Sequence, residues 1–159
     1  MTAIVHGLFH AAIKTADLAA TVHFYCDILG LKQVHRPDFG YPGAWLACPT
    51  PGGQAIVHIY AGGPALSVTG VAPIGTAAID HLSLACSGFQ DFKERFKQNQ
   101  IPWREFLVPG TSLWQLFAYD PSGVQLELTF EGTVEPGSPP DMSDAFRYRA
   151  GESFFEPRK

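Results

Sequence analysis

The stretch Ile79-Asp80-His81-Leu82-Ser83-Leu84 repeats a pattern already present near the N-terminus, where the chain reads Phe9-His10-Ala11-Ala12-Ile13. Both stretches place a histidine in a run of alternating residues, which indicates a β-strand, and a segment with apolar residues at helical spacing follows each. When the two histidines are aligned, an aromatic residue, Tyr25 or Phe96, follows fifteen positions later in each half. The sequence therefore predicts an internal repeat.

The first half, residues 1–62, is predicted to have the order β-α-β-β-β. Asp17 is a good N-cap residue, and apolar residues recur at helical spacing after it until Gly30, which suits the position just past a helix C-terminus. Three short apolar segments follow, and each of them predicts a strand: Leu31–Val34, Ala44–Cys48 and Ala55–Tyr60. These elements form a first module.

The second half, residues 79–132, is predicted to have the same order of elements. Ser87 and Gln90 form a predicted capping box, and three phenylalanines give the second helix its apolar stripe: Phe89, Phe92 and Phe96. Strands are predicted around 102–107, 114–119 and 124–130, and Asp120-Pro121-Ser122-Gly123 between the last two predicts a type I turn. A linker rich in glycine and proline, residues 63–78, joins the modules, and residues 133–159 form a C-terminal extension.

The charge pattern excludes two classes of partner. The chain of 159 residues has 11 Lys and Arg against 15 Asp and Glu, which gives a formal net charge of −4. A protein that binds nucleic acid needs a basic surface, and this composition supplies none. Residues 39–79 contain no Asp, Glu, Lys or Arg, but their prolines and glycines would break a membrane-spanning helix, so no membrane partner is expected.

The cysteines indicate a reducing compartment. Cys26, Cys48 and Cys86 are odd in number and lack a CxxC spacing, so we expect buried, reduced thiols rather than disulfides or a zinc knuckle. The first residues also lack the basic segment and long apolar core of a signal peptide. Both features predict a cytoplasmic protein.

Four residues with metal-ligand chemistry occupy matched positions in the repeat. Strand alternation places His10 and His81 on the first strand of each half, and His58 and Glu127 on the last, all facing away from the helix. A single histidine on a strand is more often structural than a ligand, but the matched positions favour a metal site. Imidazole and carboxylate ligands predict a divalent ion: Fe2+, Mn2+, Ni2+ or Zn2+.

The chain resembles the vicinal oxygen chelate superfamily, which includes glyoxalase I, methylmalonyl-CoA epimerase, fosfomycin resistance proteins, bleomycin-binding proteins and extradiol dioxygenases. The resemblance covers roughly 9–130 and lies in four motifs: Phe9-His10 leading to Asp17-Leu18, the helix end at Phe24-Tyr25 and Leu29-Gly30-Leu31, Asp80-His81, and Phe117 with Asp120-Pro121-Ser122-Gly123 and Glu127-Leu128. It implies an α+β fold of two tandem βαβββ modules, with a cupped mixed sheet around a metal. The implied ligands are His10, His58, His81 and Glu127, although the family often has Glu or Gln at the position of His58.

The resemblance implies an enzyme that chelates a small substrate through adjacent oxygens, with lyase or isomerase chemistry through an enediolate. Glu127 would then be the catalytic base, while Tyr60 and Gln125 could hydrogen-bond the oxyanion. Four further residues are predicted to bind substrate: Arg36, Phe117, Tyr119 and Tyr148. The resemblance also implies a homodimer, in which the modules close one cup within a chain or exchange between chains.

Two alternatives remain open from the sequence. An extradiol ring-cleaving dioxygenase using Fe(II) typically has a histidine and a tyrosine where this chain reads Val108-Pro109-Gly110 and Phe117, although Tyr119 could partly replace the tyrosine. A resistance protein that only binds a drug usually lacks the metal residues, and all four are present here. The C-terminal extension contains four aromatic residues, so we expect it to fold over the cup or a partner subunit and to bring Phe146, Arg147 or Tyr148 near the substrate.

Overall fold

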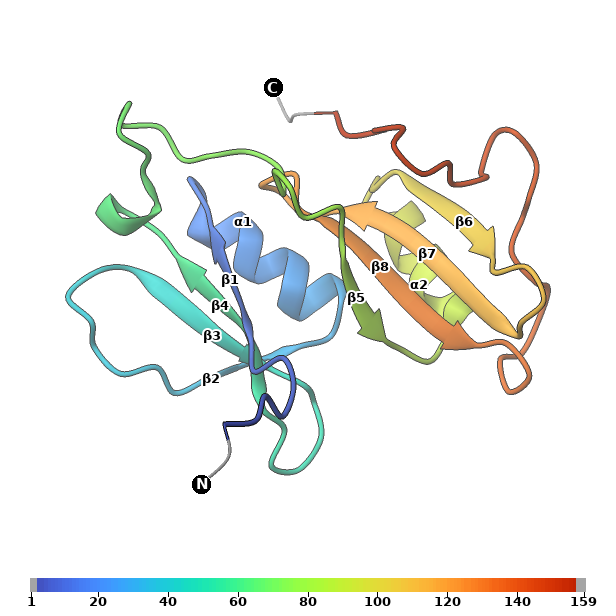
Figure 1. The fold of residues 1–159 in the computed structure, drawn as a ribbon, viewed down its shortest axis with the longest axis horizontal. Helices are drawn as coiled ribbons and strands as arrows, with labels where there is room; N and C mark the ends of the chain where they lie inside the picture. Colours follow the sequence, from blue (N-terminus) through green and yellow to red (C-terminus); the bar gives the residue numbers. More distant parts are fainter. Residues whose placement is uncertain (1–2, 157–159) are drawn as a thin grey trace. The chain divides into compact units, whose positions relative to one another are not determined.

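The computed structural model describes residues 3–156 of the chain. Two compact units are present, Met1–Pro73 and Ile74–Lys159, and each contains one four-stranded mixed sheet with a helical segment against one face (Figure 1). The boundary between the units falls inside the stretch 63–78. Within the described residues, no helix has the length and apolar character needed to cross a membrane.

The first unit has the predicted order β-α-β-β-β. Its elements are β1 (Ala11–Lys14), α1 (Leu18–His23), the π-helical segment η1 (Phe24–Ile28), β2 (Lys32–Val34), β3 (Gly43–Ala47), β4 (Ala55–Tyr60) and a short 3-10 turn, η2 (Gly63–Ala65). The strand order is β1-β4-β3-β2, with β1 parallel to β4 and the other neighbours antiparallel.

The second unit repeats this arrangement. Its elements are β5 (Leu82–Ala85), α2 (Phe89–Gln98), β6 (Trp103–Leu107), β7 (Leu113–Tyr119) and β8 (Gln125–Glu131), in the strand order β5-β8-β7-β6. Again the first strand is parallel to the last, and the others are antiparallel. The predicted α+β fold with two tandem βαβββ modules is therefore confirmed.

The first helix begins as predicted and then widens. The Asp17 carboxylate accepts a hydrogen bond from the backbone N–H of Ala20 at 2.9 Å, as expected of an N-cap. The last turns form the π-helix η1, which the sequence did not predict. Because a π-turn holds more residues than an α-turn, Phe24 is buried beside Tyr25 and Ile28, outside the apolar stripe expected for an α-helix.

The predicted capping box of the second helix is wrong. The N-cap residue of α2 is Gly88, in a left-handed conformation with φ 88°, and Ser87 makes no cap bond. The carboxylate of Glu135 instead accepts hydrogen bonds from the backbone N–H groups of Gly88 and Phe89, at 2.7 to 3.0 Å. Gln90 donates its amide to the Ser138 carbonyl. A residue of the C-terminal extension thus caps this helix.

Replacing this distant cap should destabilise the protein measurably. In Glu135→Ala, two backbone N–H groups at the positive end of the α2 dipole lose their acceptor, so we expect the free energy of unfolding to fall by about 1–2 kcal/mol. Urea denaturation of the full chain measures the change. Ser87→Ala is the matched control and should change stability by less than about 0.5 kcal/mol; equal losses in both variants would contradict the cap assignment.

The predicted turn between the last two strands is confirmed. The backbone N–H of Gly123 donates to the Asp120 carbonyl at 3.0 Å, and the Asp120 side chain accepts from the N–H groups of Ser122 and Val124 at 2.8 Å. This arrangement is the one that a type I turn with aspartate in first position requires. Within the described residues no cysteine forms a disulfide, and Cys26, Cys48 and Cys86 are half-buried rather than buried.

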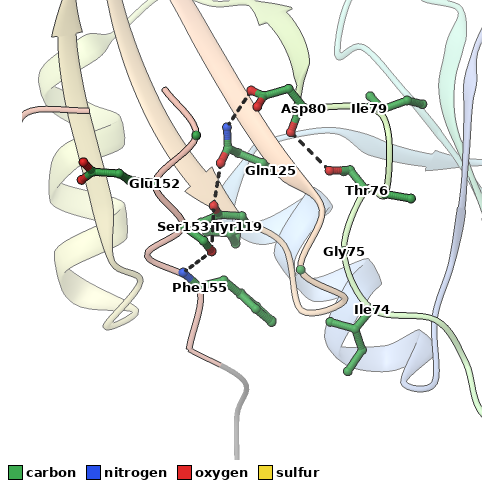
Figure 2. Close-up of a pocket in the computed structure, with 13 residues that line it drawn as sticks. Ile74, Gly75, Thr76, Ile79, Asp80, Tyr119, Gln125, Glu152, Ser153 and Phe155 are labelled. Atoms are coloured by element: carbon green, nitrogen blue, oxygen red, sulfur yellow. Dashed lines mark hydrogen bonds between the residues drawn. The ribbon is translucent and has the colours of Figure 1, made fainter. Parts of the chain in front are cut away.

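The C-terminal extension is fixed to the second unit. Its backbone pairs with β6: the N–H of Glu105 donates to the Phe146 carbonyl at 2.7 Å, and the N–H of Tyr148 donates to the Glu105 carbonyl at 2.9 Å. Farther on, residues 151–155 lie against residues 74–80 and the adjoining ends of β7 and β8, and they enclose a pocket of about 390 Å³ (Figure 2). Asp80, Tyr119 and Gln125 are among the polar residues that line this pocket.

Candidate metal ligands and substrate site

His10 and His58 form a pair in the first unit. His58 on β4 is paired with Ala12 of β1, so His10, two residues earlier, lies on the same face of the sheet. The two imidazole rings stack with centroids 3.8 Å apart. Trp45 of β3 pairs with His58 in the sheet and also stacks on it, with centroids 4.4 Å apart. The two imidazoles and the indole therefore form one stack on the sheet face.

Both imidazoles in this stack suit metal binding. Burial lowers the pKa of His58 below its usual value, and the neighbouring His10 and Arg36 lower it further, so the ring is neutral at pH 7. The Nδ1 atom of His10 is buried and has no hydrogen-bond partner among the described residues. A buried polar atom without a partner costs about 1–3 kcal/mol, which a bound ligand would offset.

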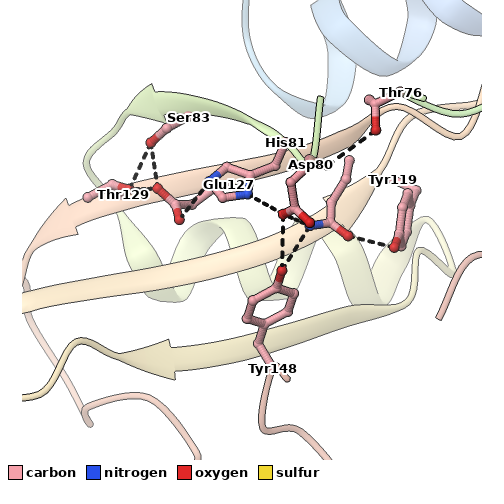
Figure 3. Close-up of polar contacts among 9 residues, drawn as sticks. Thr76, Asp80, His81, Ser83, Tyr119, Glu127, Thr129 and Tyr148 are labelled. Atoms are coloured by element: carbon pink, nitrogen blue, oxygen red, sulfur yellow. Dashed lines mark hydrogen bonds and ion pairs between the residues drawn. The ribbon is translucent and has the colours of Figure 1, made fainter. Parts of the chain in front are cut away.

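His81 and Glu127 form the corresponding pair in the second unit (Figure 3). Glu127 on β8 is paired with Ser83 of β5, and His81 lies two residues before Ser83, which is the same register as in the first unit. The Nε2 atom of His81 lies 3.3 Å from Oε2 of Glu127. The internal repeat therefore places one pair of ligand-type side chains at the same location in each sheet.

Hydrogen bonds with neighbouring side chains hold one atom of His81 and one atom of Glu127 in place. His81 Nδ1 donates to Asp80 Oδ1 at 2.7 Å, because a carboxylate can only accept. Ser83 and Thr129 donate their hydroxyl groups to Glu127 Oε1 at 2.6 and 2.8 Å. This arrangement leaves His81 Nε2 and Glu127 Oε2 as the atoms that face each other, and such outer contacts are typical of metal ligands.

The structure shows two pairs of the predicted ligands. Among residues 3–156, no group of three or more His, Cys, Asp or Glu side chains is close enough together to hold a metal. One pair belongs to each unit, so the four-ligand site remains a prediction. Three imidazoles and one carboxylate nevertheless have the chemistry of ligands to a divalent metal.

The two residues predicted to bind an oxyanion have different surroundings. Gln125 is buried, and its amide accepts from the Tyr119 hydroxyl at 2.6 Å and donates to Asp80 and to Tyr148 at 3.3 and 3.2 Å. Both N–H groups of the Gln125 amide thus donate hydrogen bonds. The side chain links Tyr119, Tyr148 and Asp80, which is the partner of His81. Tyr60 lies on the same face as His58, two residues farther along β4, and its ring is 5.6 Å from that of Tyr41.

Two of the aromatics predicted to bind substrate, Phe117 and Tyr119, contact the C-terminal extension, and the third, Tyr148, is part of it. The rings of Phe117 and Tyr148 are parallel, with centroids 3.6 Å apart, and Phe117 is buried. Burial raises the pKa of the Tyr148 phenol above its usual value, so this group is protonated at pH 7. Tyr119 contacts the rings of Phe154 and Phe155. The extension therefore packs against the second unit next to Phe117 and Tyr119.

Several residues around the pairs escaped the sequence analysis. Trp45, Ser83, Thr129 and the side chain of Asp80 all contact a predicted ligand, yet none was predicted to act on one. Strand alternation could have indicated Ser83 and Thr129, because they share a face with His81 and Glu127. Nothing in the sequence alone signals the stacking of Trp45. Arg36, predicted to bind substrate, lies just beyond β2 between the rings of Phe39 and Tyr41.

Comparisons with known proteins identify the family and the fold. The family model described as Glyoxalase/Bleomycin resistance protein/Dioxygenase superfamily matches residues 7–128. A search of curated proteins gives no match. Among solved structures, a glyoxalase family protein from Bacillus anthracis is 17% identical with a TM-score of 0.61, covering 82% of this chain and 99% of that chain.

Two further structures share the fold. A lactoylglutathione lyase from Agrobacterium tumefaciens is 18% identical with a TM-score of 0.58, covering 82% of this chain and 97% of that one. A genomically encoded fosfomycin resistance protein from Listeria monocytogenes is 15% identical with a TM-score of 0.59, covering 80% and 94%. At such low identity, these likenesses concern the fold alone.

Proposed function

Because the chain belongs to the glyoxalase/bleomycin resistance protein/dioxygenase superfamily, we propose that it is a metal-dependent enzyme of the glyoxalase type. In this proposal His10, His58, His81 and Glu127 ligate one divalent ion. The substrate is a small molecule with two adjacent oxygens, and the reaction is of the lyase or isomerase class. Members of this superfamily generally use divalent metals, and they include both lyases and proteins that modify or bind drugs.

The matched register of the two pairs is the observation that carries the proposal. In both units a histidine comes directly before the first strand, rather than on it as predicted, and lies two residues before the residue paired with the last-strand ligand, which is His58 or Glu127. Random surface histidines would have no reason to follow the symmetry of the fold. The free Nδ1 of His10 and the facing atoms of His81 and Glu127 supply the ligand atoms.

The reaction would depend on a proton transfer by Glu127. When bound, the ion would polarise a substrate carbonyl and acidify the adjacent C–H group. Glu127 Oε2 would be a ligand before substrate binds, and it would accept that proton once the chelating substrate has taken its place, because the hydroxyl groups of Ser83 and Thr129 already hold Oε1. The buried Phe117 and Tyr148 would exclude water from this side of the site.

Metal analysis of the full chain, purified without chelator, tests the first half of the proposal. We expect about one divalent ion for each set of four ligands: His10, His58, His81 and Glu127. The loaded protein is then screened against α-hydroxy ketones and methylmalonyl-type thioesters in deuterated water, where proton abstraction appears as deuterium incorporated next to the carbonyl. Deuterium incorporation that requires the metal supports the proposal.

Three outcomes would overturn this function. A chain that binds no divalent metal stoichiometrically is not a metalloenzyme of this type. An anaerobic Fe(II)-loaded sample that turns catechols yellow when oxygen is admitted is a ring-cleaving dioxygenase instead. Metal loading without deuterium incorporation, together with tight binding of an antibiotic, would indicate a resistance protein that sequesters its ligand.

A further inference from the structure

Arg36 lies on the sheet face that carries His10 and His58. In β2, Lys32 and Val34 are paired with Ala47 and Trp45, so the alternation continues to place the next residue of that series, Arg36, on the face of Trp45. Its side chain crosses the backbone of Gly43. A Cβ atom at position 43 would lie 2.3 Å from the Ile59 carbonyl oxygen, 3.1 Å from Arg36 Nε and 3.2 Å from Cζ, so the guanidinium lies close against the backbone at a position where only glycine fits.

Arg36 is half-buried, but two nitrogens of its guanidinium are buried and have no anionic partner among the described residues. Its Nε and Nη2 atoms are both buried and make no hydrogen bond to any described residue. The remaining nitrogen, Nη1, makes one long contact with the Pro37 carbonyl at 3.5 Å. Within residues 3–156, no carboxylate lies within ion-pair distance of Arg36, and residues 39–79 contain no acidic residue. Two buried donors of a cation are left unsatisfied, which is costly.

The position of the side chain is fixed by two aromatic rings. The Cζ atom of Arg36 is 4.7 Å from the ring centroid of Phe39 and 4.8 Å from that of Tyr41. Such cation–π contacts hold the plane of the guanidinium but do not satisfy its N–H groups. Nε and Nη2 share one edge of the guanidinium, so their N–H bonds are parallel and match the two oxygens of a carboxylate or phosphonate.

Arg104 in the second unit shows how an arginine without such a role is accommodated. Its Cζ atom also lies over an aromatic ring, that of Phe154, at 4.6 Å. However, its Nη1 donates to the Trp103 carbonyl at 2.9 Å, and none of its nitrogens is both buried and unpaired. Stacking on an aromatic ring therefore does not by itself leave a guanidinium with buried, unsatisfied donors.

We propose that Arg36 binds an oxyanion group of the substrate, a carboxylate or a phosphonate, through a bidentate contact with Nε and Nη2. The substrate class narrows to small anionic molecules, in which this group lies apart from the oxygens held at the metal. That it belongs to the substrate rests on the proposed function. The anion site itself does not, because it is formed by residues of the first unit alone.

Titration of the full chain with propionate and, separately, with methylphosphonate tests the anion site. NMR spectra report on the Arg36 Nε–H group and on the Gly43 backbone amide, which is present in every variant below. We expect both signals to shift with the better of the two anions. The preferred probe identifies the group as a carboxylate or a phosphonate. No saturable shift with either anion would overturn the proposal.

Variants of charge and shape make the test specific. Arg36→Gln should weaken binding of the preferred anion by about 10–100-fold, and Arg36→Lys should restore only part of the loss, because lysine lacks the parallel N–H groups. Lys32→Gln is the control, since it removes an equal charge four residues earlier, on β2, and it should change the affinity by less than about twofold. Equal effects of Arg36→Gln and Lys32→Gln would show general charge attraction and refute the site.

Repeating the titration in the presence of EDTA separates this proposal from the proposed function. Anion binding that persists in EDTA and disappears in Arg36→Gln supports the site even if the chain binds no metal. Conversely, a chain that binds metal stoichiometrically but shows no Arg36-dependent anion binding keeps its proposed function and loses this substrate class.

Discussion

Glu105→Ala should lower the free energy of unfolding by about 3–5 kcal/mol, the largest loss that we expect from a single substitution on the strands. The Glu105 side chain is 1% exposed and lies on the helix-facing side of β6. Its carboxylate pairs with Lys93 of α2 at 2.9 Å and accepts from Trp103 Nε1 at 3.0 Å and from the backbone N–H of Asp141 at 2.7 Å. Removing it leaves a lysine charge without a partner and two donors unsatisfied.

Urea denaturation of the full chain measures this loss. The matched control is Asp144→Ala, which breaks the pair of Asp144 with Arg149 at 2.6 Å, a shorter distance than that of the buried pair. Because the Asp144 side chain is 94% exposed, we expect this control to cost less than about 1 kcal/mol. A loss in Glu105→Ala no larger than in the control would show that burial does not decide the strength of the pair.

A double variant distinguishes the ion pair from simple packing. Glu105→Leu combined with Lys93→Met removes both charges and keeps apolar volume, so it should be less destabilised than Glu105→Ala. Some loss should remain, because Trp103 and Asp141 still lack an acceptor for their N–H groups. A double variant as unstable as Glu105→Ala would indicate that the charge left on Lys93 is not the main cost.

The repeat could be predicted from the sequence because each of its elements depends on a local pattern of residues. Strand alternation around His10 and His81, the Asp17 cap and the Asp120-Pro121-Ser122-Gly123 turn all depend on residues close in the chain, and the structure confirms the elements that they predicted. The matched position of His58 and Glu127 followed from counting residues along the two halves. The register of the sheets agrees with that count.

The features that the sequence did not predict depend on residues far apart in the chain. Ser87 and Gln90 satisfied the local pattern of a capping box, but Glu135 lies at the helix N-terminus and takes both N–H groups. The role of Glu105 likewise depends on Lys93 and on Asp141, which lies 36 residues farther along the chain. Contacts between residues far apart in the chain leave no periodic pattern in the sequence. Rules based on neighbouring residues, such as the capping box, therefore predict the wrong partner or none.

The two units also differ at one position where the internal repeat predicts the same contact. Trp45 and Phe117 occupy the same register, opposite His58 and Glu127. In the first unit the indole stacks on the imidazole, whereas in the second unit Phe117 stacks on Tyr148 of the C-terminal extension. The extension has no counterpart in the first half, so it makes the two pairs chemically unequal.

His81→Ala should reduce divalent-metal affinity by more than about 100-fold, because a direct ligand matters more than the outer contacts, whose loss typically costs about 10–100-fold. Asp80→Asn should fall within that lower range. Its amide could donate to His81 Nδ1, which would move the ring proton to Nε2 and occupy the ligand atom. The hydrogen bonds of Tyr148 and Gln125 to Asp80 Oδ1, both 3.3 Å, fix the carboxylate that sets this tautomer.

Competition with a fluorescent chelator measures the divalent-metal affinity of His81→Ala and of Asp80→Asn. His23→Ala is the control. His23 also pairs through Nδ1 with an aspartate, Asp27, at 2.6 Å, but its side chain is 56% exposed on α1. We therefore expect no change in affinity for this variant, and the graded order His81→Ala, Asp80→Asn, His23→Ala distinguishes a ligand from its support and from a surface histidine. Equal affinity in all three would remove His81 from the ligand set, and with it the role of Asp80 in orienting that ring.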